Sequence, residues 1–151
     1  MPPCAHRLEA LAEEMATLEA AGIDVTKQLR ISNRAQVIFP FHRLVEKMSE
    51  ARENRVAIGT TSRGIGPCYE DKIARRGIRI ADLYDPESFR VLYDVLVEDK
   101  KMLAATFNLS DTVDYAAMRD RIEALAEKFR PLVCDTSALL AEAMANRQNI
   151  L

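Results

Sequence analysis

Apolar residues recur every three or four positions through most of this sequence, which is the spacing that places side chains on one face of an α-helix. The clearest run has spacings of three, four, three and four and comprises Tyr115, Met118, Ile122, Leu125 and Phe129. Such a stripe predicts an amphipathic helix whose apolar face belongs to a core, and it says nothing about function. Pro131 follows and marks the end of this helix.

Helix-capping signals divide the rest of the chain. The apolar positions of residues 8–18 share one face, and Gly22 follows where a helix C-cap is expected. Asp85 precedes Pro86, a pair that predicts an N-cap and the first position of a helix. Asp135 predicts the cap of a last helix, and residues 37–53 are also predicted to be helical.

These patterns predict a mainly α-helical chain with about five helices. Short strand pieces are expected near residues 28–32 and 149–151. A length of 151 residues suffices for one domain with its own core. The sequence shows neither an internal repeat nor a low-complexity tract.

Composition excludes several classes of partner. The formal net charge of −2 gives no general attraction to nucleic acid or to an anionic membrane. No apolar run approaches the roughly 18–20 residues that span a bilayer. The three cysteines form no CxxC pair, which argues against a disulfide framework and against a zinc site. A reducing, cytoplasmic setting is therefore expected.

One segment, residues 58–79, holds four of the five glycines. Glycine lets the backbone approach a ligand closely, and Thr60, Thr61 and Ser62 add hydroxyl and amide donors. A helix is predicted to begin at Gly66-Pro67, where its free N–H groups suit a phosphate, and to end near residue 76.

Basic residues follow the glycines in this segment. Lys72, Arg75 and Arg76 lie three and four positions apart, so that Lys72 and Arg75 are expected to address the same anion. The alternative is a chain reversal followed by a solvated charged face, in which Glu70 and Asp71 pair locally with the basic residues. The P-loop pattern GxxxxGK followed by Ser or Thr is absent. The residue types and their spacing therefore predict a candidate phosphate-binding loop and helix, and nothing more specific.

The same segment resembles the second signature of the adenylosuccinate synthetases. The match comprises Gly64-Ile65-Gly66-Pro67-x-Tyr69-x-x-Lys72-x-x-Arg75, with Ile58-Gly59-Thr60-Thr61 before it and Arg76-Gly77-Ile78-Arg79 after it. Residues 18–23, 31–42 and 135–140 also resemble family segments. The resemblance covers residues 8–151 and identifies them as a central helical segment, whereas residues 1–7 are taken as an N-terminal extension.

The resemblance implies a parent fold and an activity. The family has an α/β fold of the P-loop-NTPase-like kind with a large, mostly parallel sheet. Its members join IMP and L-aspartate to adenylosuccinate in AMP (purine) biosynthesis, using GTP with Mg²⁺, and act as cytoplasmic homodimers.

The resemblance also assigns roles to individual residues. Thr61 matches the threonine that contacts the IMP phosphate, and Arg75 matches the arginine that reaches the partner subunit's IMP. Lys72 matches the signature lysine, and Arg63 is placed near the site without a chemical role. Ser62 stands where many members have glycine, which bears only on the freedom of the loop backbone.

Other family elements are missing from this sequence. The N-terminal GTP-binding loop of the form GDEGKGK does not occur, nor does the C-terminal part. No catalytic residue and no metal ligand is therefore assigned here, and His42 is interpreted as a packed or surface histidine. The isolated chain is expected to lack ligase activity. The alternative is a stand-alone helical module that binds anions or nucleotides, or that serves as an interaction piece.

Overall fold

The structure is a computed structural model that describes residues 5–50, 62–106 and 113–150. Its elements follow in chain order: β1 (Ala5–His6), α1 (Leu8–Ala20), η1 (Val25–Lys27), β2 (Ile31–Ser32), β3 (Gln36–Val37), α2 (Pro40–Glu50), α3 (Ile65–Ile73), η2 (Ile80–Tyr84), α4 (Pro86–Thr106), α5 (Tyr115–Phe129), η4 (Arg130–Leu132), β4 (Val133–Cys134) and α6 (Thr136–Ala145). The mainly helical character predicted from the periodicity is confirmed, with six α-helices in the described ranges.

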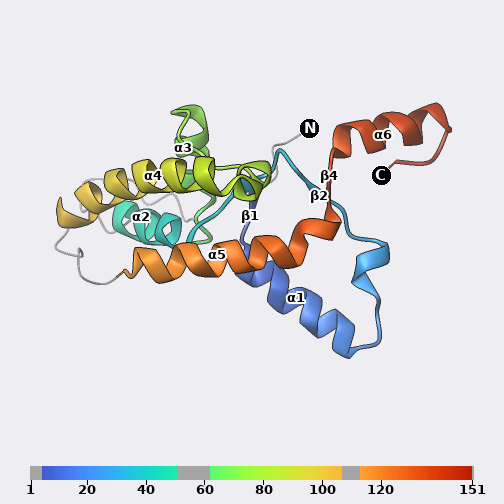
Figure 1. The fold of residues 1–151 in the computed structure, drawn as a ribbon, viewed down its shortest axis with the longest axis horizontal. Helices are drawn as coiled ribbons and strands as arrows, with labels where there is room; N and C mark the ends of the chain where they lie inside the picture. Colours follow the sequence, from blue (N-terminus) through green and yellow to red (C-terminus); the bar gives the residue numbers. More distant parts are fainter. Residues whose placement is uncertain (1–4, 51–61, 107–112, 151) are drawn as a thin grey trace.

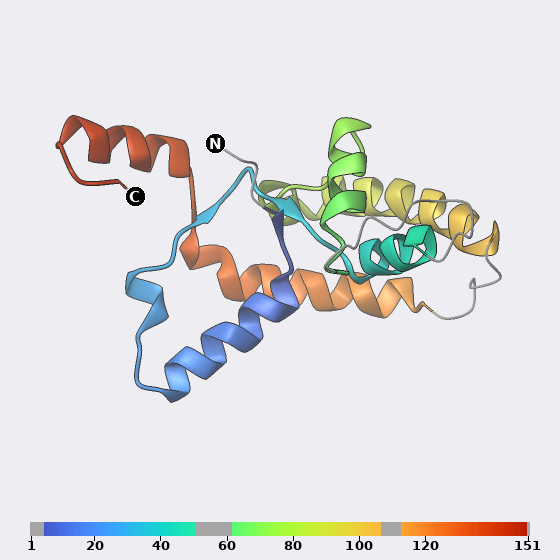
Figure 2. The same cartoon turned by 180° about the vertical axis from the view of Figure 1, so that it is seen from behind.

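The helices form a body from which α3 and α6 project (Figure 1). The long helices α4 and α5 run along this body with α2 between them, and α1 packs on α5. From behind, α3 stands across α2 and α4, while α6 extends away beyond β4 (Figure 2). None of the ten residues of α6 is buried.

Two short parallel strand pairs join distant parts of the chain. Strand β1 pairs with β3, and β2 pairs with β4. The strand expected near 28–32 is confirmed as Ile31–Ser32. Residues 149–150 are not in a strand, so the expectation there is wrong in the described part, and residue 151 lies outside it.

The predicted start of α2 is also corrected. Val37 lies in β3 and not in a helix, because its N–H donates to the carbonyl of Ile78, 2.8 Å away. The helix begins at Pro40, a position where the missing N–H of proline costs nothing. A partner 41 positions along the chain thus decides the conformation of Val37.

Aromatic rings and the predicted apolar stripes fill the core. Ile122 and Phe129 of α5 are fully buried, and the other three residues of the stripe pack against the core. Phe39 stacks on Phe41 with ring centroids 5.1 Å apart, and Tyr93 meets Phe39 edge-on at 5.5 Å. The stripe of residues 115–129 is confirmed as core.

Local capping predictions are confirmed at both kinds of helix end. Gly22 has φ +81°, and the N–H of Ile23 donates to the carbonyl of Leu18 to close α1. The Asp135 carboxylate accepts the backbone N–H groups of Ser137 and Ala138 at the start of α6. No helix within the described ranges has the length and apolar character needed to cross a membrane.

Candidate functional site

The candidate site begins at the turn that precedes α3. Gly64 is the N-cap of this helix, which starts at Ile65, one residue before the predicted Gly66. Its φ of +80° lies in the left-handed region, which suits glycine. A Cβ atom there would also lie 3.0 Å from the backbone nitrogen of Arg43 and from Cβ of His42. Glycine is therefore required both by the turn and by the close packing of the turn on α2.

Replacing Gly64 with alanine is expected to destabilise the fold by about 1–3 kcal/mol, because alanine is strained at positive φ and its Cβ presses on α2. Gly66→Ala is the matched control, since a Cβ at this helical position meets nothing within 4 Å. Urea unfolding of both variants checks the prediction. Equal stability of the two variants would contradict it.

Two polar contacts fasten this turn to α2. The N–H of Gly64 donates to Oε2 of Glu46 at 2.6 Å, and Glu46 is buried. Nε of Arg43 donates to the carbonyl oxygen of Ser62 at 3.2 Å. The turn that leads into α3 is thus held from one side by a single helix.

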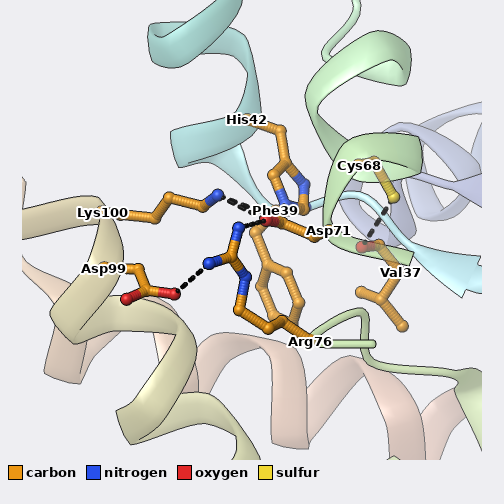
Figure 3. Close-up of polar contacts among 8 residues, drawn as sticks. All are labelled: Val37, Phe39, His42, Cys68, Asp71, Arg76, Asp99 and Lys100. Carbon is orange, nitrogen blue, oxygen red and sulfur yellow. Dashed lines mark hydrogen bonds and ion pairs between the residues drawn. The ribbon is translucent and has the colours of Figure 1, made fainter. Parts of the chain in front are cut away.

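A buried carboxylate, Asp71, fastens the other end of α3 (Figure 3). Its side chain is almost fully buried and meets His42 Nε2 at 3.0 Å and Lys100 Nζ at 2.7 Å. The N–H of Phe39 donates to Nδ1 of His42 at 3.0 Å, so the ring proton of a neutral His42 sits on Nε2 and is donated to Asp71. The prediction of a packed histidine therefore agrees with its position.

The charges of this cluster follow from burial and hydrogen bonding. Burial lowers the pKa of His42 and outweighs the opposite effect of Asp71, so the imidazole is neutral at neutral pH. Burial alone would raise the pKa of Asp71, but the hydrogen bonds from His42 and Lys100 outweigh it and lower that pKa. Asp71 is therefore an ionised carboxylate paired with Lys100.

Acidification is expected to destabilise the fold. The pKa of His42 is lower in the folded chain than its ordinary value of 6.5, so between the two values the unfolded chain binds more protons and stability falls as the pH drops. Asp71, also lowered, adds a second loss below its ordinary pKa of 3.8. Urea unfolding at about pH 7 and about pH 5 measures the first loss. His42→Gln should remove this loss. If the free energy of unfolding of that variant falls as much between the two pH values as that of the unmodified chain, the loss does not come from His42.

Arg76 belongs to the same cluster, although its side chain is 43% exposed. Its guanidinium lies 3.5 Å from Asp71 Oδ1 and 2.9 Å from Asp99 Oδ2 of α4 (Figure 3). The alternative of local pairing between Asp71 and the basic run is thus correct for Arg76. It is incomplete for Asp71, which also joins α3 to α2 and α4.

The helix ends earlier than predicted. It stops at Ile73, and Arg75 adopts φ +60° in the left-handed region. The N–H groups of Arg76 and Gly77 both donate to the carbonyl of Asp71, at 2.8 and 2.9 Å, which closes the helix in a tight turn. The expected end near residue 76 is wrong because this turn reverses the chain first.

The residues singled out by the motif are placed as follows. Arg63 and Arg75 are exposed, and Lys72 is half-buried with Nζ 5.6 Å from the centre of the Tyr69 ring. Thr61 lies outside the described residues. Lys72 and Arg75 therefore both lie at the C-terminal end of α3, one in the helix and the other in the turn after it.

A separate groove of about 430 Å³ lies between α2 and α5. Arg43, Lys47 and Arg121 line it together with Glu9 and Asp114, so side chains of both charges face it. Neither Lys72 nor Arg75 lines it, so this groove is distinct from the surface at the end of α3. Within the described part of the chain, no group of three or more His, Cys, Asp or Glu side chains could hold a metal ion.

Comparison with known proteins gives a consistent result. The family model for adenylosuccinate synthetase matches residues 3–151. An adenylosuccinate synthetase of Solibacter usitatus is 57% identical over 142 residues, which are 94% of this chain and 33% of that protein. One from Heliobacterium modesticaldum is 47% identical over 141 residues, again 33% of its length.

A solved structure shows the same relationship in three dimensions. The structure of fully ligated adenylosuccinate synthetase from Plasmodium falciparum superposes with a TM-score of 0.79 at 27% identity, over 94% of this chain and 32% of that one. The chain thus spans about a third of the length of the relatives it matches. On the evidence of the signature in residues 64–75, the matching fold and these identities, this chain belongs to the adenylosuccinate synthetase family.

Proposed function

We propose that this chain supplies part of the IMP site of an adenylosuccinate synthetase. This enzyme joins IMP and L-aspartate to adenylosuccinate in AMP biosynthesis, at the expense of GTP and in the cytoplasm. The observation that carries the proposal is the anchored turn and helix of residues 62–77, which present Lys72 and Arg75 at one end. It is supported by the similarity to adenylosuccinate synthetases over nearly the whole chain.

Arg75 is the principal binding residue in this proposal. A guanidinium group can donate two parallel hydrogen bonds to a phosphate, and that of Arg75 is exposed on a turn whose backbone is fixed. Its proposed target is the IMP of a second copy, which makes the active unit a homodimer. Thr61 is proposed to contact the phosphate of the IMP bound by its own subunit, and Lys72 and Arg63 lie near the site.

In the proposed reaction, the residues of this chain bind and orient IMP and do not transfer protons. GTP with Mg²⁺ supplies the phosphoryl group that makes the 6-oxygen of IMP a good leaving group for displacement by the amine of aspartate. Among the described residues, no group of three or more His, Cys, Asp or Glu side chains could hold a metal ion, so no Mg²⁺ ligand is assigned to them. Holding the IMP phosphate in place contributes to catalysis through positioning.

Isothermal titration with IMP, with light scattering to measure the oligomeric state, tests the proposal. Arg75→Ala is expected to weaken IMP binding by about tenfold or more, because a charged hydrogen bond to phosphate is lost. Arg90→Ala is the matched control, since Arg90 is exposed on α4 and its ion pair with Glu123 is long at 3.7 Å. Equal affinities in the two variants would refute the role of Arg75. Ligase activity of the isolated chain is expected to be undetectable.

The second candidate is an interaction module without an IMP site. Large apolar side chains that are exposed along one face of α4 favour it: Val91, Val95 and Met102. Clusters of such residues are typical of surfaces that meet a partner. Self-association without IMP binding would support this candidate, whereas a monodisperse monomer would argue against it.

A further inference from the structure

The buried face of α3 is polar at the position where a hydrophobic residue is usual. Asp71 is only 1% exposed, yet the apolar Ile73, two positions further along, is 79% exposed. The other buried residues of this helix are Pro67 and Cys68. The C-terminal half of α3 is therefore fastened to the body by Asp71 and not by apolar packing.

Three separate elements donate to this one carboxylate. His42 approaches from α2, Lys100 from α4, and Arg76 from the turn after α3 (Figure 3). Hydrogen bonds and ion pairs are directional, so a fully satisfied buried network holds its members in one arrangement. A change at Asp71 would release the C-terminal half of α3 from α2 and α4, while Glu46 still holds the turn before this helix.

The backbone of the same residue fixes the turn that carries Arg75. The Asp71 carbonyl accepts the N–H groups of Arg76 and Gly77, which brackets the left-handed conformation of Arg75. Both arginines are exposed, and Arg76 pairs with Asp71 and Asp99. The carboxylate and the carbonyl of Asp71 thus together fix the backbone position from which the Arg75 side chain extends.

We propose that Asp71 is the positioning residue of the candidate IMP site. Its carboxylate ties α3 to α2 and α4 and so fixes the direction in which Lys72 and Arg75 reach the phosphate. The inference rests on the proposed function for the identity of the ligand. Its structural part, the fixing of α3, can be measured without a ligand.

Asp71→Asn tests the inference because it keeps the size of the side chain and removes the charge that holds Lys100 and Arg76. We expect the Kd for IMP to rise by about tenfold. The Kd for inosine, which lacks the phosphate, should stay within about twofold in an NMR titration, since Lys72 and Arg75 address only the phosphate. A general loosening of the fold would weaken the binding of IMP and inosine equally, and that result would overturn the proposal.

The control variant is Asp120→Asn, which removes the same charge from an exposed position on α5. It should bind IMP as the unmodified chain does. A tenfold loss in this control as well would assign the effect to net charge and refute the role of Asp71.

Hydrogen exchange separates this inference from the proposed function. In Asp71→Asn the amides of Arg76 and Gly77 should exchange about tenfold faster, while amides of α5 keep their rates. If the unmodified chain fails to bind IMP, the proposed function fails and the exchange rates alone decide the inference. Unchanged rates at both amides refute it. Should Asp71→Asn not fold, Lys100→Met removes the same ion pair from the α4 side and must reproduce both effects.

Discussion

Replacing Asp71 with alanine is expected to destabilise the chain by about 3–5 kcal/mol, because Lys100 would remain buried without a counter-charge. The side chain of Lys100 is 9% exposed and lies 2.7 Å from both carboxylate oxygens. His42 would lose the acceptor of its Nε2 proton, and Arg76 would keep only Asp99. Urea unfolding followed by circular dichroism measures the loss.

The double variant Asp71→Ala with Lys100→Met shows whether the unpaired charge is the cause. Removing both partners of a buried pair is often close to neutral, whereas removing one is costly. The double variant should therefore recover most of the stability lost in Asp71→Ala. A double variant as unstable as the single one would show that the carboxylate stabilises α3 chiefly through His42.

Helix positions could be predicted from sequence wherever local patterns decide them. The stripe of α5 requires only residues three and four apart, and Gly22 and Asp135 act on backbone groups of their own helix ends. Such signals lie within one or two turns of chain. A single sequence therefore contains them in full.

The strand at Gln36–Val37 could not be predicted in this way. It pairs with Ala5–His6, and Val37 also bonds to Ile78, so its conformation depends on residues about 30 and 41 positions away. The early end of α3 has a similar cause. The turn at Arg75 is held by Asp71 within the motif, and the burial of Asp71 is set by other helices.

The position of the candidate site in the sequence could be predicted, but the residues that hold α3 in place could not. The motif of residues 64–75 marks Lys72 and Arg75, and the structure shows them at the end of α3. His42 and Lys100 each lie 29 residues from Asp71, at no helical or strand period. Nothing in the spacing of charged residues distinguishes Asp71 from its exposed neighbour Glu70, because burial is a property of the assembled helices.

Replacing Phe39 with alanine is expected to cost about 3–5 kcal/mol, through the cavity left by a buried ring. Phe39 is 0% exposed and contacts the rings of Phe41, Tyr93 and His42. Leu139→Ala on α6 is the control, because Leu139 is 44% exposed and its replacement should change stability by less than about 0.5 kcal/mol. The stabilities of the two variants are compared by the midpoints of their urea unfolding curves, provided that the dependence of unfolding free energy on urea concentration is the same.

The position of Phe39 links this loss to the candidate site. Its N–H sets the tautomer of His42, and its ring packs beside the same imidazole, so a collapse around the cavity would move the donor that faces Asp71. Phe39→Ala and Asp71→Asn should therefore be non-additive in a double-mutant cycle, with a coupling of about 0.5 kcal/mol or more. Strict additivity would mean that the aromatic core and the Asp71 network stabilise the fold independently, and that α3 keeps its orientation when the core beneath His42 is loosened.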